Sequence, residues 1–134
     1  MNTVIGKVKY HPKQGLKVYV SFDFCLFYRW LISKDNWNTL VPEVPRFGAH
    51  INIWNPNVHN KAPKNPRKWH NKEIEINYDP EKLIKRKSRK GFFIWWFDVE
   101  SKELCQILEE TGMKSEFDSR NRPHLTIGNT KYLL

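Results

Sequence analysis

The chain of 134 residues is 40% hydrophobic and 14% aromatic, which predicts a single domain over residues 1–134 that buries its own core without disulfide or metal support. Its 23 lysines and arginines outnumber the 14 acidic residues, and the formal net charge of +9 favours an anionic partner such as a phosphate, a nucleic acid or a lipid surface. The sequence shows neither a signal-peptide pattern nor an apolar run of transmembrane length, so we expect a cytoplasmic protein without a membrane partner.

The apolar patterns predict six strands interrupted by two helices. In chain order these are strands over 4–10 and 16–22, a helix over 24–33, strands over 50–54, 73–77 and 92–97, a helix over 99–111, and a strand over 124–128. The second helix carries an apolar stripe of Leu104, Ile107 and Leu108. Asp23 and Asp98 precede the two helices and are expected to cap them.

Two basic stretches separate the predicted strands. They are NKAPKNPRKWHNK over residues 60–72 and EKLIKRKSRK over residues 81–90. We interpret each as a solvated surface loop. The whole proline-containing segment 55–71 is long for a loop in a compact domain, and we expect it to be either functional or mobile. Trp69 places an aromatic ring among the cations of the first loop, a combination that suits base stacking beside phosphate contacts.

The chain contains the same order of elements twice. A strand, a helix and a second strand occupy approximately residues 16–54, and the same series recurs over approximately 91–128. The final strand of each copy begins with a histidine, and His124 lies 74 residues after His50. The repeat predicts an α+β fold of two pseudo-symmetric β-α-β lobes, whose antiparallel sheets form a central cleft.

The two histidine strands carry the residues expected to perform chemistry. Side chains alternate along a strand, so His50 shares a face with Asn52, and His124 shares a face with Thr126. Two imidazoles across a phosphodiester can act as general base and general acid, although the sequence does not assign the roles. Thr126 and Asn52 can donate hydrogen bonds to the non-bridging phosphate oxygens, where charge builds in the transition state.

The motifs HLTI at 124–127 and HINI at 50–53 resemble the paired H-x-T-x strands of the two-histidine phosphoesterase superfamily, with Asn52 where threonine or serine is usual. The runs VIGKVKYHPKQGLKVYVSFDFCLFYRWLIS and PHLTIGNTK are further similar to the phage anti-CBASS phosphodiesterases. The resemblance implies cleavage of cyclic di- or trinucleotides such as 3',3'-cGAMP to a linear product without a metal. It also implies action in the cytoplasm of a bacterial host, where it would counter CBASS antiviral signalling.

Aromatic residues beside the predicted cleft are candidates for stacking on the bases of such a substrate. These are Tyr10, Trp54 and Trp69. Lys131 follows the second motif and is a candidate phosphate ligand. The apolar run FFIWWF over residues 92–97 is instead interpreted as core or sheet packing.

The sequence predicts no metal site and no cofactor, because it has no carboxylate cluster and no paired metal-ligand spacing. Cys25 and Cys105 lie in helical patterns and are expected to be reduced thiols in the core. A protein partner is not required by this interpretation, and the oligomeric state is not fixed by it.

Two alternatives stay open. The first is another enzyme of the same superfamily, which acts on 2'-5' oligoadenylate or on RNA ends with a 2',3'-cyclic phosphate. The second is a non-catalytic module that sequesters a nucleotide messenger, which Asn52 and the basic loops would allow.

Overall fold

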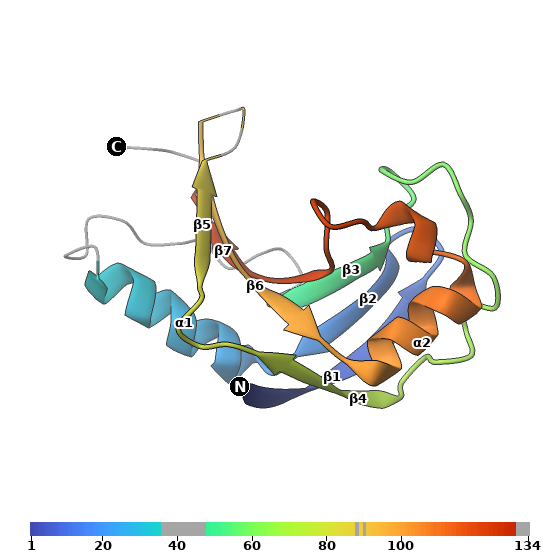
Figure 1. The fold of residues 1–134 in the computed structure, drawn as a ribbon, viewed down its shortest axis with the longest axis horizontal. Coiled ribbons are helices and arrows are strands. Elements are labelled where there is room, and N and C mark those ends of the chain that lie inside the picture. The colour runs from blue at the N-terminus through green and yellow to red at the C-terminus, as the bar shows by residue number, and fades with distance from the viewer. Residues whose placement is uncertain (36–47, 88, 90, 131–134) are drawn as a thin grey trace.

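The computed structural model describes residues 1–35, 48–87, 89 and 91–130, and it shows an α+β protein, as predicted (Figure 1). The strands within these residues are β1 (Asn2–His11), β2 (Gly15–Val20), β3 (His50–Trp54), β4 (Glu73–Tyr78), β5 (Ile84–Lys87), β6 (Phe93–Glu100) and β7 (His124–Asn129). The helices are α1 (Phe22–Asp35), α2 (Lys102–Thr111) and the short 3-10 helix η1 (Lys114–Glu116).

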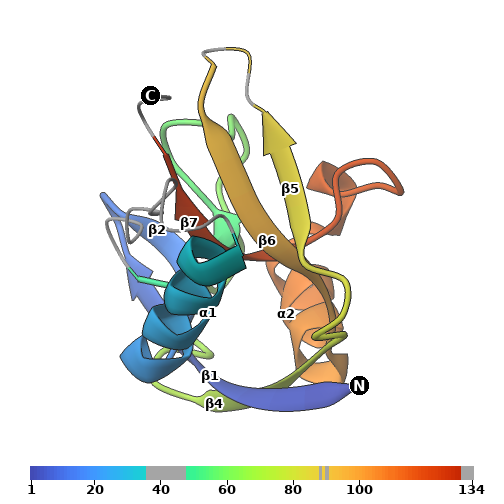
Figure 2. The same ribbon diagram turned by 90° about the vertical axis from the view of Figure 1, so that its left-hand side faces the viewer.

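The described strands form one antiparallel sheet in the order β4-β1-β2-β3-β7-β6-β5. An additional pairing between β4 and β6 joins distant parts of this order, so the sheet curves strongly (Figures 1 and 2). Strands β3 and β7 come from parts of the chain far apart in sequence and meet in the middle of the order. This pairing brings the two histidine motifs next to each other.

Each helix packs against a strand outside its own β-α-β unit. Helix α1 connects β2 to β3 but packs on β7, where the Cys25 thiol contacts the Ile127 carbonyl at 3.4 Å. The ring of Tyr28 lies 4.9 Å from that of the fully buried Phe97. Helix α2 connects β6 to β7 but packs beside β4, and Figure 2 shows the two helices apart from each other. The core therefore ties both halves of the chain together.

The predicted helix caps are wrong. Ser101 caps α2, because its hydroxyl accepts the backbone N–H of Leu104 at 3.1 Å. Asp98 lies within β6, which continues to Glu100 as it pairs with β4 and so delays the start of the helix. Asp23 lies inside the first turn of α1 rather than before it.

One of the two basic stretches contains a strand. Residues 84–87, predicted as loop, form β5, and Lys85 pairs with Trp95 of β6. Charged residues of this kind are common on sheet edges, where they discourage pairing with another chain. A run of charged residues also lacks the alternation of apolar and polar residues from which strands are predicted. The stretch 55–71 has no helix or strand, as predicted, and Asn71 at its end donates its N–H to the Val8 carbonyl of β1 at 2.7 Å.

Both cysteines are free thiols. Cys25 is buried in the core, as predicted, but Cys105 is exposed, because the buried stripe of Leu104, Ile107 and Leu108 lies on a different side of α2. In the part of the chain that the structure describes, no helix is long and apolar enough to cross a membrane.

Candidate active site

Four polar side chains meet where β3 pairs with β7. His50 lies directly opposite Thr126 and Ile51 opposite Leu125, and Asn52 and His124 are the next residues of the two strands beyond this pairing. Because alternate residues of a strand share a face, all four side chains lie on one side of the sheet. They form a rectangle with the histidines on one diagonal and the two hydrogen-bonding groups on the other. Diagonal neighbours of an antiparallel pair are about 7–8 Å apart, which leaves room for a phosphate between the imidazoles.

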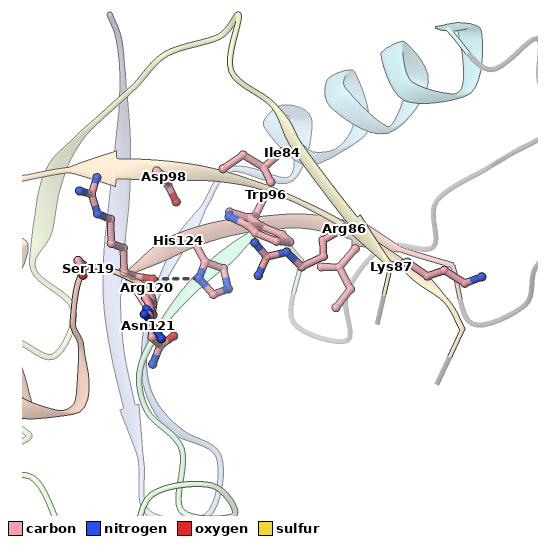
Figure 3. Close-up of a pocket in the computed structure, with 11 residues that line it drawn as sticks. Ile84, Arg86, Lys87, Trp96, Asp98, Ser119, Arg120, Asn121 and His124 are labelled. Carbon is pink, nitrogen blue, oxygen red and sulfur yellow. Dashed lines mark hydrogen bonds between the residues drawn. The ribbon is translucent and has the colours of Figure 1, made fainter. Parts of the chain in front are cut away.

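Both histidines are fixed by the same local contact. Nδ1 of His50 lies 2.7 Å from the Gly48 carbonyl oxygen. Nδ1 of His124 likewise lies 3.1 Å from the Arg122 carbonyl oxygen, and Figure 3 draws this contact as a dashed line. A carbonyl oxygen can only accept, so each Nδ1 carries a hydrogen and donates it. In the neutral form, Nε2 of each ring therefore keeps its lone pair and is able to take up a proton.

The other histidines of the chain have the opposite arrangement. In each of them Nδ1 accepts a backbone N–H, which leaves the hydrogen of the neutral ring on Nε2. These contacts are His11 with Lys13 at 3.1 Å, His59 with Asn55 at 2.9 Å and His70 with Tyr10 at 2.9 Å. Of the five histidines, the two in the predicted motifs are thus those whose neutral rings can accept a proton at Nε2.

His50 and His124 differ in their surroundings. His50 is only 8% exposed, and burial lowers the pKa of its imidazole below the ordinary value. The Gly48 carbonyl opposes this shift, whereas the positive charges of Lys17 and His124 lower the pKa of His50 further. His124 is half-buried and borders an open pocket. Burial and the Lys17 cation therefore favour the neutral form of His50, which is the form of a general base.

The neighbouring strands give the rectangle two unlike walls. On β2, Tyr19 pairs with His50 and the buried Lys17 pairs with Asn52. On β6, Trp96 pairs with Thr126, and Asp98 pairs with His124. Lys17 was not predicted as a site residue, because a lysine that alternates with apolar residues in LKVYV has the pattern of a solvent-facing position. It is nevertheless only 4% exposed, in a strand that lies inside the sheet between β1 and β3.

A pocket of about 660 Å³ opens beside His124 (Figure 3). Its walls come from β5, β6 and the segment before β7, and they comprise Ile84, Arg86, Lys87, Ile94, Trp96, Asp98, Ser119, Arg120, Asn121, Arg122 and His124. The interpretation of FFIWWF as packing fits Trp95, which is 3% exposed. It does not fit Trp96, which is half-buried, lines the pocket and has its ring 5.4 Å from that of His124.

Trp54 faces away from the two histidines. It pairs with Leu16, while Asn52 pairs with the next residue, Lys17, so Ile53 is an extra residue that makes a β-bulge. The bulge turns Trp54 to the face of the fully buried Leu16, where its ring stacks on Tyr10 at 6.3 Å. Trp54 was a candidate ligand because it directly follows the motif of His50, but the bulge places it on the other face of the sheet.

The other predicted substrate ligands also lie outside the pocket of His124. Tyr10 borders a separate hollow together with Tyr19. The indole N–H of Trp69 donates to Glu110 of α2 at 2.7 Å, and the Lys72 ammonium lies 5.2 Å from the ring. Lys131 falls outside the described residues.

Comparison of the chain with models of protein families, with curated proteins and with solved structures finds no match. Among the described residues, no group of three or more histidine, cysteine, aspartate or glutamate side chains is placed to hold a metal ion.

Proposed function

We propose that the protein is a phosphodiesterase that cleaves cyclic di- or trinucleotide messengers such as 3',3'-cGAMP and thereby counters bacterial CBASS signalling. The observation that carries the proposal is the pair of diagonal histidines, each with Nδ1 bound to a carbonyl and Nε2 left for proton transfer. Two such groups on either side of one phosphodiester provide the base and the acid that its cleavage requires.

The surroundings of the histidines favour one assignment of roles. His50 is the general base, because burial and the Lys17 cation lower the pKa of its imidazole and keep it neutral. Its Nε2 takes the proton from the attacking oxygen as that oxygen forms a bond to phosphorus. His124 in its protonated form then gives the Nε2 proton to the leaving oxygen as the bond from phosphorus to that oxygen breaks. Attack by the adjacent 2'-hydroxyl yields a 2',3'-cyclic phosphate, and attack by water yields a phosphomonoester.

The other diagonal of the rectangle stabilises the charge that develops on the phosphate. Thr126 offers a hydroxyl directly across from His50, and Asn52 offers an amide NH₂ on the same face of β3 as His50. The amide replaces the usual hydroxyl of the motif with another hydrogen-bond donor. The site therefore keeps a donor at both corners.

The order of elements supports a two-histidine phosphoesterase fold. Strand, helix and strand follow each other as β2-α1-β3 and again as β6-α2-β7, and the last strands of the two units pair with each other. This arrangement suits two pseudo-symmetric lobes over approximately residues 16–54 and 91–128. The choice of a cyclic substrate rests on the resemblance of the two motifs and of the N-terminal run to anti-CBASS phosphodiesterases.

Product analysis on a panel of substrates tests the proposal. The purified protein is incubated in EDTA with 3',3'-cGAMP, a cyclic trinucleotide, 2'-5' oligoadenylate and an RNA with a 2',3'-cyclic phosphate, and the products are separated by chromatography. We expect multiple turnovers on the cyclic oligonucleotides. Cleavage of only the other two substrates would assign the chain to another activity of the superfamily, and tight binding without any product would indicate a sequestering module.

A further inference from the structure

Three arginines line the pocket beside His124. They are Arg86 on β5 and Arg120 and Arg122 in the segment that leads into β7. Among the described residues that line the pocket, Asp98 provides the only carboxylate. Within the described residues, the ion pairs of the protein lie elsewhere and join Lys68 to Glu110, Lys82 to Asp79 and Lys114 to Glu109. In the described part of the chain, none of these three arginines takes part in a salt bridge, and together they outnumber Asp98, so the pocket carries a net positive charge.

Arg86 is held in place by the aromatic residue next to His124. Its guanidinium lies 5.6 Å from the centre of the Trp96 ring, within the range of a cation–π contact. Figure 3 shows Arg86, Trp96 and His124 close together, whereas Lys87 extends away from them. A guanidinium that rests on an indole still has donors available for an anion, and its position is already ordered.

We infer that Arg86, together with Arg120 and Arg122, binds the second phosphate of a cyclic dinucleotide while the first phosphate lies between His50 and His124. The inference rests on the proposed function and specifies how its substrate is recognised. A cyclic dinucleotide carries two phosphodiesters in one ring, so a second anion must be accommodated near the first. His50 is only 8% exposed, and the pocket lies on the side of His124.

The size and the chemistry of the pocket fit this ligand. Sites for small ligands have volumes of about 300–1,000 Å³, and this pocket has about 660 Å³. Arginine suits a phosphate because its planar guanidinium can donate two parallel hydrogen bonds to one oxyanion. A substrate with a single phosphodiester would leave these arginines without a ligand. The pocket therefore selects for substrates with two phosphates.

The test compares 3',3'-cGAMP with linear ApG, which has one phosphodiester. The variant is Arg86→Gln, and the matched control is Arg67→Gln, because the Arg67 guanidinium likewise lies over an aromatic ring, that of Tyr10 at 5.1 Å, away from His124. We expect the preference for 3',3'-cGAMP over ApG, as a ratio of kcat/KM, to fall about tenfold in Arg86→Gln and to stay at the wild-type value in Arg67→Gln. An unchanged ratio in Arg86→Gln would overturn the inference.

Binding measurements separate this inference from the proposed cleavage. If the wild-type protein turns over neither compound, calorimetry gives its dissociation constants for both. Tighter binding of 3',3'-cGAMP that weakens about tenfold in Arg86→Gln would support the second phosphate site even though the catalytic proposal had failed. Equal affinity for the two compounds, or no binding of either, would overturn the site as well.

Discussion

Replacement of Thr126 by valine removes one hydroxyl from the site and keeps the shape of the side chain. Thr126 lies directly opposite His50 in the β3–β7 pair, at a typical Cβ–Cβ distance of about 4.5–5.5 Å. A phosphate between the two histidines would place a non-bridging oxygen within reach of this hydroxyl. The variant therefore tests one hydrogen bond to the developing charge.

The size of the effect follows from the exposure of the site. A hydrogen bond to a charged group contributes about 1.5–3 kcal/mol, and each 1.4 kcal/mol corresponds to roughly a factor of ten in rate. Thr126 is half-buried, so water can partly replace the lost hydroxyl, and the lower part of this range applies. We expect kcat for 3',3'-cGAMP to fall about 10- to 30-fold in Thr126→Val. Valine fills the same volume, so the melting temperature should stay close to that of the wild type.

The assay measures kcat and KM by chromatography of the linear product, with thermal melting of each variant. Thr3→Val is the matched control, because its exposed hydroxyl on β1 bonds to Asn77 at 2.7 Å, away from the histidines. An unchanged kcat in a folded Thr126→Val would refute the role of this hydroxyl. A rise in KM alone would also refute it, because the hydroxyl would then bind the ground state and the transition state equally.

Three further variants probe the base and the fold. The pKa of His50 is lowered first by burial and then in part by Lys17, so Lys17→Met should raise that pKa. The acidic limb of the pH profile of kcat/KM should then move to higher pH, and an unchanged limb would count against His50 as the base. Phe97→Ala empties a fully buried site and should cost about 3–5 kcal/mol in urea unfolding, and a loss below about 1 kcal/mol would contradict this packing. Gly15 has a φ of +106°, and Gly15→Ala would place a Cβ 2.2 Å from the Trp54 carbonyl oxygen. The variant should therefore have a lower melting temperature than the wild type, and equal melting temperatures would contradict this close approach.

The strands that carry the motifs were predictable from local pattern. In HINIW and HLTIGN the residues Ile51, Leu125 and Ile127 are fully buried, and one buried face is what produces alternation in a sequence. The repeat of elements along the chain predicted that the two histidine strands would meet, and β3 does pair with β7. The tautomers of His50 and His124 needed the structure, because they depend on which backbone atom lies beside each Nδ1.

The walls of the site were not predictable from the sequence alone. The extra residue Ile53 reverses the facing of Trp54. In β6, alternation alone puts Trp95 in the core and Trp96 on the pocket face, but the uniform apolar run FFIWWF conceals which face is buried. A bulge is set by pairing with another strand, so the local pattern does not reveal it. Lys17 and Arg86 have the pattern of ordinary surface residues in the sequence, and only the pairing of β2 with β3 and of β5 with β6 brings them to the two sides of the histidine strands.

The most direct test of the central claim is the turnover of 3',3'-cGAMP in EDTA by the wild-type protein, His50→Ala and His124→Ala, with His11→Ala as control. His11 lies in an exposed position at the end of β1, and its Nδ1 accepts an N–H, so its loss should not affect cleavage. We predict multiple turnovers by the wild type and by His11→Ala, and a loss of about 100-fold or more in each of the other variants while they remain folded. Normal cleavage by either His50→Ala or His124→Ala, or no product from the wild type, would contradict the assignment of these two histidines as base and acid.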